Sequence, residues 1–174
     1  TFRGMENRFT IVRGGGVTLV KDYNSHPTCM RKVLESAQDL VDGRIFTVFK
    51  PYRYTLIKYL QHEYGAAFKG SDEVLITKMY AAEEDPIPGI STQTVVDRIE
   101  ENDLNVTYIE DQTKITEYLH TVVKPGDKVI FFGGDDFFQM ADGFAAELAI
   151  RAEKTHSDPK QPRVSGPLAV EEQP

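Results

Sequence analysis

The hydrophobic positions of the chain alternate between two patterns: short apolar runs, and longer segments whose apolar residues recur every three or four positions. Short runs are typical of buried strands, whereas the second spacing places the apolar residues on one face of a helix. Residues 8–22 predict two strands joined at three consecutive glycines, which is typical of a hairpin. Further strands are predicted at 44–50, 72–80, 105–110 and 125–134. Helices are predicted at 30–41, 57–68, 91–102, 111–123 and 135–154.

After the hairpin, strands and helices alternate, and this order predicts the fold class. We expect an α/β, doubly wound, mostly parallel sheet of Rossmann-like form, with helices on both faces and an N-terminal β-hairpin. Ser91 is expected to cap the helix at 91–102, and Asp42-Gly43 to end the helix at 30–41. Residues 1–154 are expected to form one domain. Residues 155–174 are Pro-rich and polar without an apolar face, which predicts a flexible tail.

The segments that follow the strands carry most of the unusual residues of the chain. In parallel sheets of this class, ligands bind beyond the carboxyl ends of the strands. Four strand-to-helix junctions lie there, and they are rich in Asp, Tyr, Arg and Glu. These junctions are residues 22–28, 50–55, 79–91 and 133–136.

The first junction has more polar residues than a turn requires. It reads DYNSHPT, and Pro27 suits the first position of a helix, where its missing N–H costs little. Capping by Ser25 or Asn24 would explain one polar residue but not four. We therefore favour a functional role for this junction, as is common for loops on a rigid scaffold.

The other junctions admit two interpretations each. Arg53 stands between two tyrosines, and its planar fork could hold a carboxylate or phosphate, or it could simply stack on tyrosine at the surface. The three acids at 83–85 precede a Pro-Ile-Pro-Gly turn, and a solvated charge run is the default reading. Gly133 and Gly134 could offer backbone N–H groups to an anion at a helix start. We slightly favour plain helix capping by Asp135 or Asp136 there.

Composition narrows the functional class. The chain has 174 residues, of which 40% are hydrophobic and 27% charged, as expected for one globular domain. Its formal charge of −7 argues against nucleic-acid binding. Cys29 is the single cysteine, so no internal disulfide can form and a reducing compartment such as the cytoplasm is expected. No apolar run reaches the roughly 20 residues of a membrane helix, so no membrane partner is expected.

Several catalytic motifs are missing from the sequence. It contains no G-x-x-x-x-G-K-[ST] phosphate loop, no G-x-G-x-x-G and no G-x-S-x-G nucleophile elbow. One Cys and four scattered His do not make a zinc site, so no metal site is predicted. The N-terminus lacks a signal-peptide core and an initiator Met, which suggests a piece of a longer chain.

Read together, the four junctions resemble the C-terminal domain of the Mur ligase family. The family patterns are D-D-Y-G-H-H-P-T-E, F-Q-P-H-R-Y-[ST]-R, Y-A-A-G-E-x-P-I-x-G and K-P-G-D-x-V-x-x-x-G-A-G-D. The corresponding stretches here are KDYNSHPTC, FKPYRYTL, YAAEEDPIPG and KPGDKVIFFGGDD, in the same order. The opening FRGMENRF is similar to the family's F-x-G-x-x-R-R-F, so the resemblance covers residues 2 to about 150. It is strongest to the branch that adds L-alanine to UDP-N-acetylmuramate.

The resemblance implies a function and partners. It implies an ATP-dependent, cytoplasmic ligase of peptidoglycan precursor synthesis that joins UDP-N-acetylmuramate to L-alanine or a related amino acid through an acyl phosphate. In the family, an N-terminal domain binds the UDP-sugar, and a central domain contains the phosphate loop and the Mg²⁺ ligands. The C-terminal domain closes over them and completes the nucleotide and amino-acid sites. This chain would therefore bind ATP and Mg²⁺ mainly through missing domains and be inactive alone.

Residues of this chain that match the family patterns are expected to have the roles of the corresponding family residues. The resemblance implies nucleotide-binding roles for three residues: Asp22, Tyr23 and His26. It implies that five others lie at or near the substrates: Ser25, Tyr52, Arg53, Glu84 and Asp136.

The sequence also departs from the family pattern at several junction positions. The replacements are Asn24 for Gly, Ser25 for His, Tyr52 for His, Leu56 for Arg, and Glu83 and Asp135 for Gly. They leave the accepted amino acid and the subfamily open. A free-standing α/β module that binds a nucleotide or small molecule without catalysis is the alternative. A phosphate-receiver domain is excluded because Lys50-Pro51-Tyr52 provides no phosphoacceptor Asp.

Overall fold

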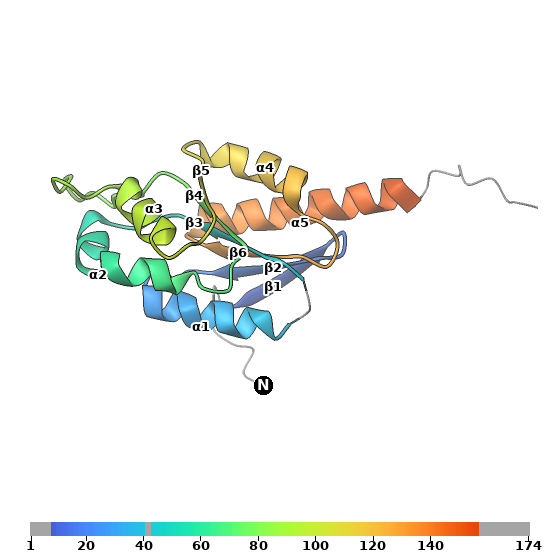
Figure 1. Ribbon diagram of the computed structural model, residues 1–174. Coiled ribbons are helices and arrows are strands. Elements are labelled where there is room, and N and C mark those ends of the chain that lie inside the picture. The colour runs from blue at the N-terminus through green and yellow to red at the C-terminus, as the bar shows by residue number, and fades with distance from the viewer. Residues whose placement is uncertain (1–7, 41–42, 157–174) are drawn as a thin grey trace, which may run out of the picture.

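Six strands form a single sheet in the computed structural model, which describes residues 8–40 and 43–156 (Figure 1). The strands are β1 (Thr10–Gly14), β2 (Val17–Asp22), β3 (Ile45–Phe49), β4 (Glu73–Ile76), β5 (Val106–Tyr108) and β6 (Lys128–Phe132). Their order across the sheet is β1-β2-β6-β3-β4-β5. Only β1 runs antiparallel to its neighbour, and all other pairs are parallel. The predicted α/β fold with an N-terminal hairpin is confirmed.

Helices cover both faces of the sheet. They are α1 (Pro27–Gln38), α2 (Tyr54–Ala67), α3 (Thr92–Glu100), α4 (Ile115–Val122) and α5 (Asp135–His156), with a 3₁₀ turn η1 (Gln112–Lys114) before α4. The first three helices pack on one face and the last two on the other (Figure 1). None of the described helices is both long enough and apolar enough to cross a membrane.

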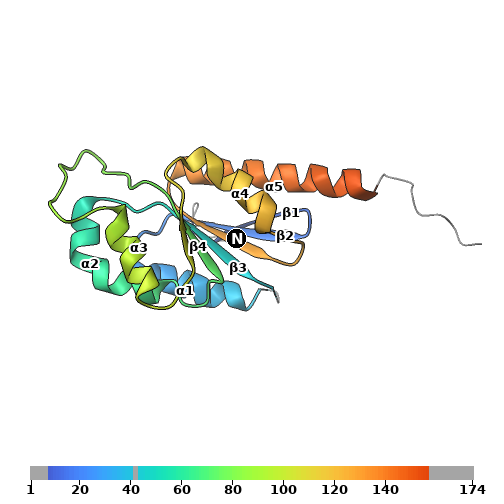
Figure 2. The same ribbon diagram turned by 45° about the horizontal axis from the view of Figure 1, so that its top comes forward.

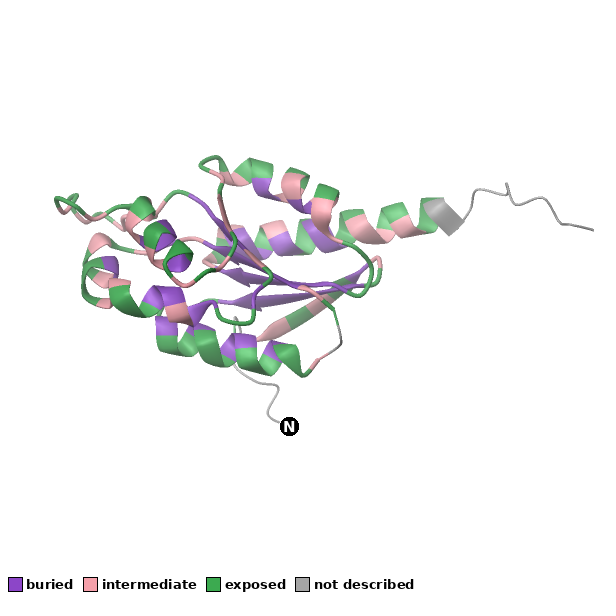
Figure 3. Cartoon of the chain, viewed as in Figure 1, coloured by how far each residue is buried: buried purple, intermediate pink, exposed green. Residues whose placement is uncertain are grey.

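The alternating side chains of the strands build a core on each face. Along β6, Ile130 and Phe132 pack toward α1, α2 and α3, whereas Val129 and Phe131 pack toward α4 and α5. Both sets are fully buried, so this central strand is apolar from Val129 to Phe132, as expected for a parallel strand covered on both faces. Figure 3 shows the consequence, with buried central strands between helices whose outer sides are exposed.

The hairpin turn depends on small residues. Gly15 and Gly16 have φ of +55° and +79°, which glycine adopts without steric cost. A β-carbon on Gly14 would lie 2.0 Å from the carbonyl oxygen of Ala145, so the hairpin can pack closely against α5 only with glycine there.

Several element boundaries differ from prediction. The strand predicted at 72–80 ends at Ile76, and its remainder belongs to a loop. The helix predicted at 111–123 begins as the 3₁₀ turn η1. His26 occupies the cap position of α1 that the sequence predicts for Ser25 or Asn24, and its side chain makes no capping hydrogen bond. Asp135 and Asp136 lie inside the first turn of α5 rather than before it.

Other boundary predictions are confirmed or fall outside the described residues. Ser91 caps α3, and its backbone N–H donates to the hydroxyl of Thr94 at 3.0 Å. Helix α1 ends at Gln38, and Asp42 lies outside the described residues. Helix α5 continues to His156, two residues past its predicted end at residue 154, whereas residues 157–174 lie outside the described part.

Candidate functional site

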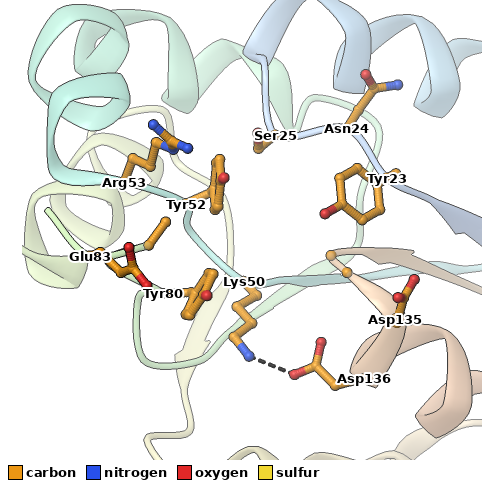
Figure 4. A pocket seen from close by; sticks show the side chains of 13 residues that line it. Tyr23, Asn24, Ser25, Lys50, Tyr52, Arg53, Tyr80, Glu83, Asp135 and Asp136 are labelled. Atoms are coloured by element: carbon orange, nitrogen blue, oxygen red, sulfur yellow. Dashed lines mark hydrogen bonds and ion pairs between the residues drawn. The ribbon is translucent and has the colours of Figure 1, made fainter.

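The carboxyl ends of the parallel strands meet at one edge of the sheet, and the four junctions come together there. They surround a cavity of about 580 Å³ (Figure 4). The loop between β4 and α3 reaches out beyond this edge (Figure 2). The lining residues are Tyr23, Asn24, Ser25, Lys50, Tyr52, Arg53, Tyr80, Ala82, Glu83, Gly133, Gly134, Asp135 and Asp136.

Lys50 lies at the centre of the polar contacts on the cavity floor. Its Nζ donates to Asp136 Oδ2 at 2.6 Å and to Gln112 Oε1 at 3.0 Å. The ammonium group also lies 5.7 Å from the ring centroids of both Tyr80 and Phe137. One side chain thereby connects the segments that follow β3, β4, β5 and β6.

The partner of Lys50 is a carboxylate held in its charged form. Burial raises the pKa of Asp136, but the hydrogen bond and charge of Lys50, together with the hydrogen bonds from Gln112 and the Phe137 N–H, outweigh burial, so the pKa lies below its ordinary value. A second hydrogen bond comes from Gln112 at 3.2 Å. Asp136 is thus fixed as an anion toward Lys50.

A hydrogen-bonded frame links the loops after β3 and β4. Tyr52 and Tyr80 form an isolated parallel bridge, in which the Arg53 N–H donates to the Tyr80 carbonyl and the Tyr80 N–H to the Pro51 carbonyl, both at 2.9 Å. The rings of Tyr52 and Tyr80 stack with centroids 6.0 Å apart. The two loops therefore form one continuous wall of the cavity.

Arg53 projects from this frame with its guanidinium half exposed. The group lies 5.0 Å from the Tyr52 ring centroid and 3.8 Å from Glu84, and 47% of its side chain is accessible. Glu84 is itself held by Thr55, which donates its N–H at 2.9 Å and its hydroxyl at 2.5 Å. These two hydrogen bonds from Thr55 are the main reason why the pKa of Glu84 is lowered.

The opposite wall comes from the loop after β2 and the start of α5. Tyr23 is 52% exposed and packs edge-on against Phe138, with ring centroids 6.3 Å apart. The Ser25 carbonyl accepts a hydrogen bond from the buried Tyr64 hydroxyl at 2.8 Å, which anchors this loop to α2. Figure 4 shows Tyr23 facing the Tyr52–Tyr80 wall across the cavity.

Asp22 does not line the cavity, but its buried carboxylate holds the backbone of the loop after β2, which forms part of the cavity wall. Its carboxylate is 2% exposed and accepts the backbone N–H groups of Phe9 and Asn24, each at 2.9 Å. Arg8 approaches it at 3.5 Å. His26, at the cap of α1, is exposed and also lies outside the lining.

The predicted site residues are therefore brought to one edge but not all to the cavity. Of the nucleotide set, Tyr23 alone lines it; of the substrate set, Ser25, Tyr52, Arg53 and Asp136 line it, and Glu84 stands behind Arg53. Sequence reasoning missed Lys50, Tyr80 and Glu83 as lining residues, although all three fall within the junctions at 50–55 and 79–91. Within 8–40 and 43–156, no three His, Cys, Asp or Glu residues are arranged to hold a metal ion.

Comparison with known proteins identifies the family. The model of the family described as "Mur ligase, glutamate ligase domain" matches residues 7–134. The chain belongs to the Mur ligase family. A UDP-N-acetylmuramate–L-alanine ligase from Sorangium cellulosum is 36% identical to this Mur ligase domain over 157 residues, covering 87% of this chain and 34% of that enzyme. The domain thus spans about a third of the length of the curated relatives it matches.

Solved Mur ligases share the fold of this domain. MurC, the UDP-N-acetylmuramate–alanine ligase of Thermotoga maritima, superposes with a TM-score of 0.65 at 18% identity, covering 88% of this chain and 31% of that one. The Thermotoga maritima MurF ligase in complex with ADP superposes with a TM-score of 0.61 at 23% identity, covering 87% and 33%. At these identities the likeness concerns the fold.

The buried carboxylate of Asp22 predicts a structural phenotype. Asp22→Ala leaves two backbone N–H groups without their acceptor, and such a loss costs about 1–3 kcal/mol. We expect the free energy of unfolding of the Mur ligase domain, measured by urea denaturation, to fall by that amount. Asp85→Ala, an exposed acid of the β4–α3 loop outside the lining, serves as the control and should change it by less than about 0.5 kcal/mol. Equal stabilities of the two variants would contradict the role given to Asp22.

The lowered pKa of Asp136 predicts an acid-dependent stability. Because this pKa is lower in the folded state, the stabilisation is present above the unfolded value of about 4 and is lost as the pH falls through the folded value. At pH 7 the Asp136→Asn variant should be less stable by at most about 1 kcal/mol, since its side chain is 42% exposed and solvent screens the pair. Urea denaturation at several pH values between 7 and 3 should show this difference shrinking toward acid. A difference that stays constant over the range would disprove the coupling to Lys50.

Proposed function

We propose that this chain is the C-terminal domain of an ATP-dependent carboxylate–amine ligase of peptidoglycan precursor synthesis. The enzyme would join L-alanine or a related amino acid to the lactyl carboxylate of UDP-N-acetylmuramate, through an acyl phosphate. The observation that carries the proposal is the cavity itself: four loops at one sheet edge form a wall rich in charge and aromatic rings. The family patterns fall on the same loops.

The chain supplies binding groups rather than a complete reaction centre. Its sequence has no phosphate loop, and the described residues offer no cluster of ligands for Mg²⁺. The Mg²⁺ and most of the triphosphate contacts are therefore assigned to the central domain, and the UDP-sugar to the N-terminal domain. These two domains are the proposed partners, and the fragment alone is proposed to be inactive.

Two parts of the cavity suit two substrates. Tyr23 offers an exposed ring beside Gly133 and Gly134, where the N-terminus of α5 favours negative charge. The related MurF ligase was solved in complex with ADP, which supports a nucleotide substrate for the complete enzyme. On the opposite wall, Arg53 presents a half-exposed guanidinium that can hold the carboxylate of the amino acid.

The contribution of these residues to catalysis would be positioning. ATP, when bound, supplies the phosphoryl group that activates the sugar carboxylate. Arg53 would hold the amino acid by its carboxylate so that its amino group points at the activated carbon, which converts an encounter into an oriented reaction. The frame between the loops after β3 and β4 holds the backbone from which the Arg53 side chain projects.

A test of the proposal uses the complete enzyme, in which this chain would be joined to the proposed N-terminal and central domains. The complete protein should release ADP and phosphate only when UDP-N-acetylmuramate, ATP, Mg²⁺ and an amino acid are all present. The isolated chain should release none under the same conditions. Ligation by the isolated chain, or a complete protein that binds nucleotide without any ligation, would reject the proposal in favour of another function.

Arg53 provides a sharper test of the amino-acid site. In the complete enzyme, Arg53→Ala should raise the KM for the amino acid by roughly 10–100-fold, because a charged hydrogen-bond partner is worth about 1.5–3 kcal/mol. The KM for ATP should stay within twofold. Arg13→Ala, an exposed arginine on β1 outside the lining, is the matched control and should leave both values unchanged. Unaltered kinetics for Arg53→Ala would remove Arg53 from the site.

A further inference from the structure

We infer that Glu84 is a positioning residue of the amino-acid site: it holds the guanidinium of Arg53 in the orientation that receives the carboxylate of the acceptor. The inference rests on the proposed function and adds a residue to the same site. The family resemblance places Glu84 near the substrates without giving it a role, and in the structure Glu84 is not among the residues that line the cavity. Glu84 therefore acts on the acceptor through Arg53 and not by touching the acceptor itself.

Glu84 lies against the N-terminus of α2. Its two carboxylate oxygens accept the N–H and the hydroxyl of Thr55, the second residue of that helix, at 2.9 and 2.5 Å. Arg53 occupies the cap position of α2 and makes no capping hydrogen bond with its own side chain. The carboxylate of Glu84 thus supplies the acceptor that a helix N-terminus needs and that Arg53 cannot provide.

The position of Arg53 favours a neighbouring anion. A helix N-terminus carries partial positive charge, which disfavours a cation whose side chain begins at the cap position. Glu84 Oε1 lies 3.8 Å from Arg53 Nη1 and offsets that charge. The ring of Tyr52 gives a second contact, with its centroid 5.0 Å from the guanidinium carbon (Figure 4). The guanidinium therefore has two neighbours that favour one orientation over the others open to a long side chain.

The contact between Glu84 and Arg53 leaves the guanidinium able to bind a ligand. A hydrogen bond between such groups spans about 2.7–3.2 Å from heavy atom to heavy atom. At 3.8 Å the two charges attract each other, but Glu84 does not occupy the N–H groups of Arg53. Because 47% of its side chain is accessible, Arg53 can donate two parallel N–H groups to an arriving carboxylate.

Glu84 can hold Arg53 because its own position is fixed. The Glu84 N–H donates to the Ala81 carbonyl at 3.1 Å, which closes the turn that directs the side chain toward Thr55. Only 19% of the Glu84 side chain is accessible. The hydrogen bonds from Thr55 lower the pKa of Glu84 and outweigh its burial, so the carboxylate is charged at neutral pH. A fixed anion of this kind restrains a neighbouring cation with little ordering of its own.

A carboxylate beside Arg53 also repels the carboxylate of the acceptor, so two opposite effects have to be compared. The repulsion is reduced because both oxygens of Glu84 accept hydrogen bonds from Thr55 at the positive end of α2. The orienting effect acts on Arg53 directly, since an unrestrained arginine must be ordered when the acceptor binds, and this ordering lowers affinity. We expect the orienting effect to be the larger of the two.

The experiment compares two acceptors that differ only in the group held by Arg53, in the complete enzyme. L-Alanine and L-alaninamide share the amino group and the methyl group, so the ratio of their kcat/KM values reports recognition of the carboxylate. This ratio does not depend on how much of a variant is folded. We expect Glu84→Gln to lower it roughly 3–10-fold, which is the effect of leaving one long side chain unordered before binding. Glutamine keeps an oxygen for Thr55 and removes the charge that faces Arg53.

The matched control removes an equal charge from the next residue of the same loop. Asp85 is exposed and lies outside the cavity lining. Asp85→Asn should leave the ratio within twofold of the wild-type value. An equal fall in both variants would assign the effect to the general field of the loop and overturn the inference.

A double-mutant cycle separates the positioning of Arg53 from the capping of α2. Without the guanidinium Glu84 has nothing to position, so the ratio for the Arg53→Ala, Glu84→Gln double variant should lie within twofold of that for Arg53→Ala alone. If Glu84 serves only as a cap, Glu84→Gln lowers kcat/KM for both acceptors alike and leaves the ratio unchanged, which would overturn the inference. A further fall in the double variant, or a ratio that rises in Glu84→Gln, would also overturn it.

Failure of the inference and failure of the proposed function are distinguishable. If the inference alone is wrong, the complete enzyme still ligates L-alanine and Arg53→Ala still lowers the ratio, whereas Glu84→Gln does not. If the proposed function is wrong, the complete protein ligates no amino acid, and no variant has an activity to compare.

Discussion

The ammonium group of Lys50 is the contact on which the geometry of the cavity depends. A charge that leaves bulk water must find partners in the protein, because an unpaired one is strongly destabilising. Lys50 is only 19% exposed and finds Asp136, Gln112 and the faces of two aromatic rings. These partners follow three different strands, so the contacts of one charge, together with the Tyr52–Tyr80 bridge, hold the loops after β3, β4, β5 and β6 to one another. The parallel sheet brings the loops to one edge, and the contacts of Lys50 hold the loops against one another there.

This dependence explains which features could be predicted from the sequence. The strands, the helices and the edge that carries the site follow from local apolar periodicity, which needs no knowledge of distant residues. The partners of Lys50 are 62 and 86 residues away in the chain, and a lysine after an apolar run is indistinguishable in sequence from one that faces water. Asp22 was assigned to the nucleotide by motif alone, because its burial depends on backbone N–H groups that only the folded loop presents to it. The adjacent acids Glu83 and Glu84 have different surroundings, which the sequence also does not show. The turn of the folded loop directs Glu84 toward Thr55 and leaves Glu83 lining the cavity.

The cavity has the electrostatics of an incomplete site. In a finished protein interior, charges are paired, whereas here the guanidinium of Arg53 is loosely engaged and the carboxylate of Glu83 has no partner in the described part of the chain. The loops that carry them are nevertheless rigidly joined by the Tyr52–Tyr80 bridge. Unsatisfied groups on a rigid frame are what a binding surface needs, because the ligand supplies the missing partners and little ordering is required when it arrives.

Backbone strain is also concentrated in the residues that line the cavity. Five described residues other than glycine have positive φ, and three of them, Arg53, Ala82 and Glu83, line the cavity. Each such residue costs of the order of 1 kcal/mol, and the surrounding structure must hold it in place. The restraint comes from the neighbours: the Arg53 N–H is bonded to Tyr80, and the turn at Ala82 and Glu83 is closed by Glu84 and secured through Thr55. The strained backbone positions are therefore those whose side chains face the cavity. The hydrogen bonds that hold these positions are made to neighbouring residues of the domain. In such an arrangement the sheet sets the positions of the loops, and the loops, not the ligand, set the positions of the binding groups.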